Sequence, residues 1–488
     1  MIDPVALARV KPAVLGAAGV ALWWGVGRLA VGRSFDPGGA VFAVYFLLVA
    51  STVAGDVVAR FPPLPALVGQ LVAGFLLRNL PGIGPAVGAA VDATFSASAR
   101  TAALGVILAR AGISLDVPAM WRLRWPASRL AFAPATVEAL AVTLLAVPVL
   151  GMSWSYAAAL GFLFAGISPA VVIPSLLALQ DKGYGVEAGV PTLVVTAASV
   201  DVVYAIAGFG AVSSALPGMG EGGAAEAAWK APAQILGGVL GGAVAGAALG
   251  AATAGPPEEE AEEADAKAGS ERRKADEWSP ASRASALMGV SLLALYGGAE
   301  LELSGGAALA VIVASAVAAR GWGGARAKAA GATLNVVWAK LAQPLLFALI
   351  GAAVDLTRLE GGIVGLGVVV LLVGLFARCG VAFLAAGGGA LSRSERLFVA
   401  VAWVPKATVQ AALAGLPLDA AVAAFGKDSK EAEEAELLLA LGVLAIAITA
   451  PLGAAAVAAS GEKLLLKKGR DQQGSAEGAG GEGGGARV

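Results

Sequence analysis

The sequence predicts an all-α protein that crosses a membrane many times. Of its 488 residues, 58% are hydrophobic and only 14% are charged, and its mean hydropathy is +0.79. These proportions leave no soluble interpretation, because a soluble fold could not keep so much apolar surface away from water. Apolar runs of helical length also recur along most of the chain. We therefore expect the apolar surface to face a lipid bilayer.

Fourteen apolar runs, each bounded by glycine, proline or charged residues, are candidate membrane spans. Several are shorter than the ~20 residues that a perpendicular helix needs, which indicates tilted, re-entrant or broken helices. Because the first run is long enough to span and others follow it, no cleavable signal peptide is expected. The approximate limits of the runs are 12–32, 40–60, 64–79, 99–115, 129–150, 155–179, 189–213, 232–253, 282–299, 306–319, 328–353, 361–387, 393–416 and 432–458.

Basic residues are unevenly distributed between the two sides that this count defines. With a cytoplasmic N-terminus, the inner loops and tails hold 22 Lys and Arg, and the outer loops hold 8. This imbalance agrees with the positive-inside rule. We therefore expect both termini in the cytosol, with the protein in the plasma membrane or an organelle membrane such as a mitochondrial or endolysosomal one.

A charged stretch divides the chain near its middle. Residues 254–281 contain a run of glutamates and then basic residues, the pattern of a solvated cytoplasmic linker. We expect residues 1–36 to add an N-terminal helix, residues 37–253 to form a first half with a linking helix, and residues 282–458 to form a second half. The glycine-rich residues 459–488 are expected to be a disordered cytoplasmic tail.

Composition also excludes several functions. The chain has no histidine and a single cysteine, Cys379, so it lacks a histidine zinc ligand, a Ser-His relay and an intramolecular disulfide. Its net charge of −1 indicates no nucleic-acid partner. We expect no enzymatic activity, no cofactor and no resident metal, so proton chemistry must use carboxylates or lysines.

Two of the runs are interrupted by proline. The run at 155–179 contains Pro169 and Pro174, and the run at 393–416 contains Pro405. Interior prolines remove a backbone hydrogen bond, so both helices should unwind locally. The two runs are seven apart in order and therefore cross in opposite directions. Broken helices at matching places in inverted halves are typical of a secondary-transporter binding site.

Charged residues accompany these breaks. Four basic residues lie inside apolar runs: Arg110, Lys340, Arg378 and Lys406. A lysine at membrane depth, such as Lys406, costs roughly 2.5–3.5 kcal/mol on insertion scales and usually marks an ion or substrate path. Arg110 and Lys340 lie close enough to the ends of their runs for their side chains to reach the membrane surface. Asp201 follows the first broken helix and can exchange a proton for Na⁺ or Li⁺. The alternative role of Asp201 is a structural salt bridge with Lys406. Lys406 itself either competes with the transported cation or is purely structural.

Other polar residues fit the same region. Glu138 and Arg378 lie in runs that correspond in the two halves, and they are interpreted as a structural or gating pair. Ser168 and Thr408 lie beside the breaks and either coordinate a cation through their hydroxyls or bond back to their own helices. The glycines between Gly237 and Gly246 have a small-xxx-small spacing, which favours close helix packing.

The ordered motifs resemble a known family, the monovalent cation:proton antiporters, and within it the animal-type sodium/proton antiporter subfamily B of solute carrier family nine. The resemblance extends from about Pro62 to Gly453. It implies a homodimer of fourteen-helix protomers with two crossing broken helices and elevator-like exchange of Na⁺ or Li⁺ for H⁺. The stretches that carry it include Leu71-Val-Ala-Gly-Phe-Leu-Leu-Arg-Asn79, Ile167-Ser-Pro-Ala-Val-Val-Ile-Pro-Ser175, Gln343-Pro-Leu-Leu-Phe347, Trp403-Val-Pro-Lys-Ala-Thr-Val-Gln-Ala-Ala412 and Ile448-Thr-Ala-Pro-Leu-Gly453.

The resemblance also assigns residues. Asp201 matches the first of the family's paired aspartates, Lys406 its motif lysine, and Glu138 and Arg378 its core charge partners. The second aspartate of the pair is Val202 here. Three classes of function therefore stay open: an antiporter that uses Asp201 alone, a transport-impaired paralogue, and a leak-type cation carrier.

Overall fold

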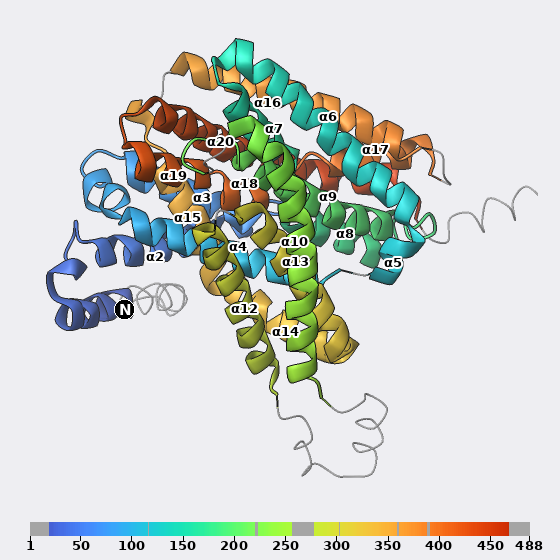
Figure 1. Ribbon diagram of the computed structural model, residues 1–488, viewed down its shortest axis with the longest axis horizontal. Helices are drawn as coiled ribbons and strands as arrows, with labels where there is room; N and C mark the ends of the chain where they lie inside the picture. Colours follow the sequence, from blue (N-terminus) through green and yellow to red (C-terminus); the bar gives the residue numbers. More distant parts are fainter. Residues whose placement is uncertain are drawn as a thin grey trace, which may run out of the picture.

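The computed structural model describes residues 19–115, 117–219, 223–255, 278–301, 303–358, 361–387 and 391–467. Within these ranges the regular structure is helical, apart from one isolated bridge between Tyr184 and Lys467 (Figure 1). Much of the expected N-terminal addition, most of the expected linker at 254–281 and most of the expected tail lie outside the described residues. The final helix continues to Leu464, so the tail begins later than residue 459.

By length and composition, nine helices in the described ranges are able to cross a membrane, or ten if one bent pair is counted as a single span. The bent pair is Ala66–Asn79 with Gly84–Ala90, which meet at 106°. This result confirms an all-helical, polytopic membrane protein. The count of fourteen spans remains a prediction, although helical residues coincide with every one of the fourteen apolar runs.

The helices pack into two bundles, and each bundle takes helices from both halves of the chain. We call the first the glycine-packed bundle. In it α10 packs on α13, α13 on α4 and α12, and α3 on α2 and α15. Its members are α2 (Ala40–Ala59), α3 (Ala66–Asn79), α4 (Ala93–Ile113), α10 (Gly223–Ala252), α12 (Pro280–Glu300), α13 (Ser304–Trp322), α14 (Gly324–Val337) and α15 (Gln343–Ala353), with a π-helical turn at Trp338–Ala342.

We call the second the broken-helix bundle. In it α6 packs on α7, α9 and α16, and α20 packs on α8, α17 and α19. Its members are α6 (Arg124–Leu150), α7 (Trp154–Ala165), α8 (Pro169–Asp181), α9 (Val190–Ser213), α16 (Gly361–Ala385), α17 (Arg393–Ala402), α18 (Thr408–Leu413), α19 (Leu416–Phe425) and α20 (Lys430–Leu464). The short α5 (Val117–Arg122) connects α4 of one bundle to α6 of the other.

Glycine sets the contact between α10 and α13. A Cβ atom added at Gly242 would lie 2.5 Å from the carbonyl oxygen of Ala310, and one at Gly246 would lie 2.4 Å from that of Ala314. No larger residue fits such a backbone-to-backbone approach. The close packing expected from the small-xxx-small spacing is therefore confirmed, and the two helices run side by side in Figure 1.

Both proline-containing runs are broken, as expected. The first is non-helical at 166–168, directly before Pro169, which occupies the first turn of α8 and needs no backbone donor there. The second is non-helical at 403–407, around Pro405. Pro174 differs from the expectation because α8 continues through it, so its missing donor costs one hydrogen bond without ending the helix.

An ion pair joins the two bundles. Arg100 on α4 pairs with Asp419 on α19, and a second nitrogen of the same guanidinium donates to the Ser96 hydroxyl at 2.6 Å. Gly415, at the joint between α18 and α19, packs against the guanidinium, where a Cβ would lie 3.0 Å from Nε. Arg100 is only 3% exposed. The expectation that only four basic residues lie inside apolar segments was therefore incomplete.

Candidate functional site

Four charged side chains meet where the two broken helices approach each other. All four are fully buried, with 0% exposure. They come from four separate elements, so only the folded chain brings them together. They are Glu138 on α6, Asp201 on α9, Arg378 on α16, and Lys406 in the non-helical stretch between α17 and α18.

Three ion pairs connect these side chains in a row. Arg378 lies between the two acids, with one nitrogen 2.9 Å from Glu138 Oε2 and the other 2.8 Å from Asp201 Oδ1. Lys406 Nζ lies 2.7 Å from Glu138 Oε1. The two acids and two bases balance at their formal charges. Such pairing is required at this depth, since an unpaired buried charge is very unfavourable.

The bases also hold the ends of the broken helices. Arg378 donates to the carbonyl of Ala165, where α7 ends, and its Nε donates at 3.2 Å to the carbonyl of Trp403, just after α17. Lys406 Nζ donates to the carbonyl of Phe164. Carbonyls at a helix C-terminus lack partners within the helix and carry partial negative charge, so a cation is favoured there. The breaks and the buried bases therefore stabilise each other.

Asp201 has partners on both of its oxygens. Oδ1 accepts from Arg378, and Oδ2 accepts from the backbone N–H of Ile167 at 2.9 Å. Ile167 lies in the first break, which frees its N–H from helical bonding. The neighbouring N–H of Ser168 donates at 2.9 Å to the carbonyl of Pro405, so the two breaks touch. Each oxygen thus has one partner, which leaves lone pairs of the carboxylate for a further ligand.

The pairing of Lys406 differs from the sequence-based expectation. Its ammonium contacts Glu138, whereas Arg378 is the base that contacts Asp201. The backbone explains this choice, because the Lys406 N–H donates to the Thr449 hydroxyl on α20 at 2.9 Å and so fixes where the side chain starts. The proposed contact between Glu138 and Arg378 is present.

Ser168 and Thr408 lie next to the cluster without bonding to it. Ser168 precedes α8 and Thr408 is the first residue of α18, and they are 0% and 5% exposed. Within the described part of the chain, neither hydroxyl is hydrogen-bonded to Asp201, and Ser168 Oγ has no partner. Both remain candidate cation ligands by position only.

Gln410 is a buried polar residue that sequence reasoning did not single out. Its amide nitrogen donates to the carbonyls of Leu163 and Gly166, at 2.7 and 2.9 Å, and so ties α18 to the first break. Its amide oxygen is buried and unpartnered. A glutamine in the apolar stretch after Lys406 was a usable signal, because a polar side chain at this depth must find a backbone partner. Thr449, which fixes Lys406, was missed in the same way.

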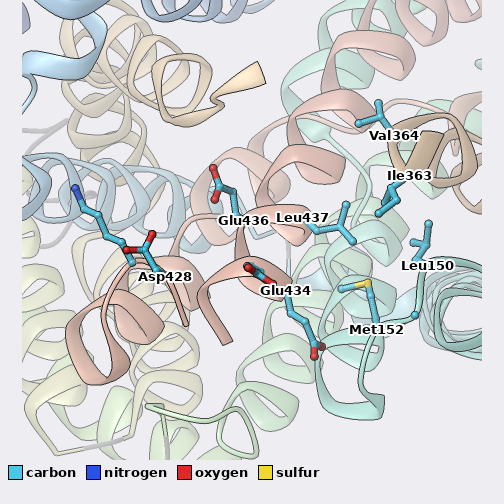
Figure 2. Close-up of a pocket in the computed structure, with 11 residues that line it drawn as sticks. Leu150, Met152, Ile363, Val364, Asp428, Glu434, Glu436 and Leu437 are labelled. Carbon is cyan, nitrogen blue, oxygen red and sulfur yellow. The ribbon is translucent and has the colours of Figure 1, made fainter. Parts of the chain in front are cut away.

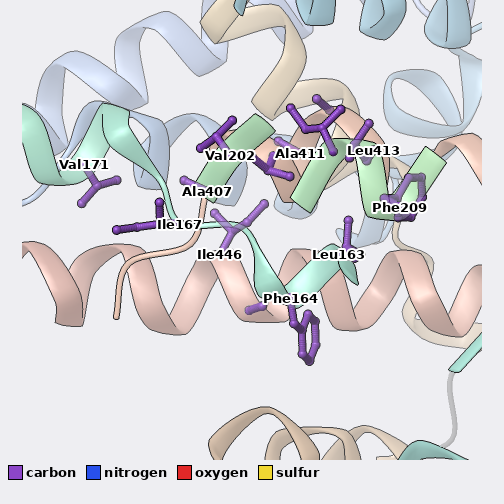
Figure 3. Packing of buried hydrophobic residues seen from close by; sticks show 14 of the residues in the cluster. Leu163, Phe164, Ile167, Val171, Val202, Phe209, Ala407, Ala411, Leu413 and Ile446 are labelled. Atoms are coloured by element: carbon purple, nitrogen blue, oxygen red, sulfur yellow. The ribbon is translucent and has the colours of Figure 1, made fainter. Parts of the chain in front are cut away.

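Val202 follows Asp201 on α9 and is buried, with 4% exposure. It belongs to the large apolar cluster that also contains Ile167 and Ala407 from the two breaks, as Figure 3 shows. At this position the chain therefore places an apolar side chain in the cluster that includes residues of both breaks. The site contains one carboxylate from α9.

A cavity of about 410 Å³ lies at a different set of residues (Figure 2). It is lined by the end of α6, the start of α16 and the start of α20, including Met152, Glu434 and Leu437. None of the four clustered charges lines it. In the described residues, moreover, no group of three or more acidic or cysteine side chains is placed to hold a metal ion.

Comparison with known proteins gives a consistent result. A family model described as sodium/hydrogen exchanger, transmembrane, matches residues 273–459. Human sodium/hydrogen exchanger 9B2 is 34% identical over 454 residues, covering 92% of this chain and 79% of the human protein. Human sodium/hydrogen exchanger 9B1 is 33% identical over 444 residues, covering 90% of this chain and 80% of that protein.

The fold is similar to that of a solved structure. The sodium proton antiporter MjNhaP1 from Methanocaldococcus jannaschii, solved at pH 8, superposes with a TM-score of 0.64 and 17% identity. The superposition covers 87% of this chain and 98% of that one. At this level of identity the likeness concerns the fold.

Proposed function

The chain belongs to the sodium/hydrogen exchanger family, and from this membership we propose that it exchanges Na⁺ or Li⁺ for H⁺ across its membrane by alternating access. It is a transporter of that family and an integral membrane protein. The observation that carries the proposal is the row of buried charges at the two breaks, with Asp201 as the remaining carboxylate of the site. The exchanged ions are its substrates, and no cofactor takes part.

The arrangement of Asp201 supports competition between a cation and a proton. A cation that binds its carboxylate replaces the positive charge of Arg378, and Arg378 still has Glu138 2.9 Å away as a partner. A proton on Asp201 releases Arg378 in the same way, because it removes the negative charge. Two ligands that bind the same group in turn are the condition for coupled exchange. Oxygens of Ser168 and Thr408 are the proposed further ligands.

The balanced charges favour a second candidate. With Val202 in place of the family's second aspartate, the two buried acids are already neutralised by two buried bases, and each oxygen of Asp201 already has one partner. A cation would then add an excess positive charge to a fully buried site. This supports a transport-impaired paralogue, or a leak-type carrier that moves cations without proton coupling.

We further propose the architecture that the family resemblance implies. The protomer would have fourteen spans in two inverted halves with crossing broken helices, and two protomers would form a homodimer. Both termini would be cytoplasmic, in the plasma membrane or an organelle membrane. Labels at Met1 and Val488 that react from opposite sides of the membrane would disprove this orientation.

A flux assay in proteoliposomes tests the exchange. We expect Na⁺ or Li⁺ gradients to drive proton movement in the wild type and Asp201→Asn to reduce it to background. The control is Asp56→Asn, which changes an exposed acid on α2 and should leave the flux unchanged. Wild-type flux in Asp201→Asn would remove Asp201 from the mechanism. Cation current without proton movement would support the leak carrier.

The substitution Val202→Asp distinguishes the candidates further. A second carboxylate gives the site an uncompensated negative charge, which favours a bound cation. If the wild type is impaired, Val202→Asp should raise cation-dependent proton flux above the wild-type level. Rapid exchange by the wild type, unchanged or slowed in Val202→Asp, would establish that one carboxylate is sufficient.

A further inference from the structure

The connector between the two bundles exposes two tryptophans. Trp121 at the end of α5 is 70% exposed and Trp125 in the first turn of α6 is 72% exposed, and they are four residues apart. Tryptophan is normally well buried in proteins, and in membrane proteins exposed tryptophan gathers at the level of the lipid headgroups. This segment therefore has the composition of a membrane interface.

Two arginines, Arg122 and Arg124, lie between the two tryptophans in the sequence. Arg122 and Arg124 are exposed, and the Arg124 guanidinium lies over the Trp121 ring, 5.2 Å from its centroid. Between residues 117 and 137 the sequence has three arginines and no acidic residue, and a single acid, Asp116, directly precedes this stretch. The next acid, Glu138, is fully buried in the charge cluster. The sequence from Asp116 to Val137 therefore carries three arginines against one carboxylate, an excess of positive charge.

One further arginine, Arg396, meets this segment near the end of α16 and the start of α17. The guanidinium of Arg129 on α6 donates to the carbonyl of Gly387 at 3.2 Å. Arg396 on α17 lies against the same glycine, since a Cβ there would be 3.0 Å from its guanidinium. Arg396 is also held over the Phe383 ring at 4.4 Å. Two guanidinium groups from different helices are thus fixed within reach of one point.

We propose that these residues form a binding site for the phosphate headgroup of an anionic phospholipid. Arg122, Arg124 and Arg129 would attract the phosphate, and Trp121 and Trp125 would lie at headgroup depth beside the acyl chains. Guanidinium groups bind phosphate with several hydrogen bonds, and basic segments next to membrane helices attract anionic lipids. The site is on the side predicted to face the cytosol, and the proposal does not depend on which ion is exchanged.

The position of the site suggests what the lipid does. Because α5 joins one bundle to the other, a lipid bound there contacts the covalent link between them. It would hold the end of α4 and the start of α6 at a fixed depth. We therefore expect anionic lipid to stabilise the protein more than a zwitterionic lipid does.

Lipid binding can be measured on the full chain in detergent. Phosphatidylglycerol should raise the melting temperature in a concentration-dependent way, and phosphatidylcholine should not. In Arg124→Gln/Arg129→Gln the apparent affinity for phosphatidylglycerol should fall on the order of 25-fold, at roughly fivefold per arginine. The control Arg60→Gln/Lys328→Gln removes two exposed basic residues predicted to be on the same side and should bind as the wild type does.

Three outcomes would overturn the proposal. The first is undiminished phosphatidylglycerol binding by Arg124→Gln/Arg129→Gln. The second is an equal loss in the control variant, which would indicate diffuse attraction by the whole surface. The third concerns native mass spectrometry without added lipid. Loss of a second protein chain from the complex when these arginines are changed would show that they bind protein rather than lipid. Loss of bound phosphatidylglycerol mass in this variant alone would support the proposal, whatever its transport activity.

Discussion

The glycine-packed bundle and the broken-helix bundle hold helices together inside a membrane by different means. In the first, α10 and α13 approach until backbone meets backbone, and Gly242 and Gly246 leave the room for it. In the second, α7 and α17 end inside the protein. The side chains of buried Arg378 and Lys406 donate hydrogen bonds to carbonyls at these helix ends. The first bundle depends on the absence of side chains. The second also has one such approach, where a Cβ at Gly161 would lie 2.4 Å from the Ala139 carbonyl oxygen, and adds a particular set of buried charges.

This difference separates two roles. Close packing of small residues gives many weak contacts that no ion disturbs, which suits a frame. Charge pairs across two breaks can be rearranged by one ion or one proton, which suits a site. The comparison predicts that the first bundle is sensitive to added volume and the second to removed charge.

The largest effect is expected from Arg378→Gln. This change leaves Asp201 without a base and removes a donor from the Ala165 and Trp403 carbonyls. Breaking a buried pair by removing one partner costs about 3–5 kcal/mol. The detergent melting temperature should fall sharply, whereas Arg393→Gln, at an exposed position on α17, should change it little. Equal melting temperatures would mean that the pairs add nothing to stability.

A smaller loss is expected from Gly242→Ala. Its new methyl group would meet the Ala310 carbonyl at 2.5 Å, so α10 and α13 must separate. Overpacking of this kind costs about 1–3 kcal/mol. The neighbouring Gly241 has nothing within 4 Å of an added Cβ, so Gly241→Ala is the matched control and should be neutral or slightly stabilising. Indistinguishable melting temperatures for the two variants would contradict close packing as the basis of this bundle.

Loss of the ion pair between the bundles should have an effect of similar size, about 1–3 kcal/mol, because only Arg100 is deeply buried and Asp419 is partly exposed. Asp419→Asn should lower the melting temperature, because it leaves the buried Arg100 guanidinium without a carboxylate partner. The exchange Arg100→Asp/Asp419→Arg should recover part of the loss. A double variant no better than the sum of its single changes would show that the pair does not couple the bundles.

The smallest effect concerns Asp355, in the loop after α15. Burial alone would raise the pKa of this carboxyl, but hydrogen bonds from Thr357 and Arg78 outweigh it and lower the pKa to about 2. Its contribution is therefore complete above the ordinary value of 3.8 and is lost as the pH falls towards 2. Because the group is partly exposed, we expect about 1 kcal/mol or less. The melting-temperature difference between wild type and Asp355→Asn should shrink over that range, and a difference that does not depend on pH would argue against the shift.

Much of this arrangement could be predicted from the sequence, for identifiable reasons. Pro169 and Pro405 locate the breaks because proline cannot continue the hydrogen-bond ladder, and Glu138, Asp201, Arg378 and Lys406 are conspicuous because charge is rare at such depth. Which of the two acids each buried base contacts could not be predicted in the same way. It depends on where each backbone is fixed, and Lys406 is fixed by Thr449 on a helix 43 residues away.

Arg100 shows a second limit. The apolar run suggests a helix from about residue 99, which places Arg100 at a helix end. The helix instead begins at Ala93, because Asp92 caps it by accepting from the Phe95 N–H at 2.8 Å, and Arg100 therefore lies within the helix. Hydropathy does not detect such a start, since the first turn of α4 is not strongly apolar.

The balance of charge in the cluster has an electrical consequence. Moving one elementary charge through a membrane potential changes the free energy by about 2.3 kcal/mol per 100 mV. A body that carries Glu138, Asp201, Arg378 and Lys406 together, at their formal charges, experiences no net force from that field. The voltage would then act only on whatever ion or proton is added to the four. Without a bound ion or proton, movement of the site across the membrane would produce no current. With one bound, the recorded current would report the charge of that ion or proton alone.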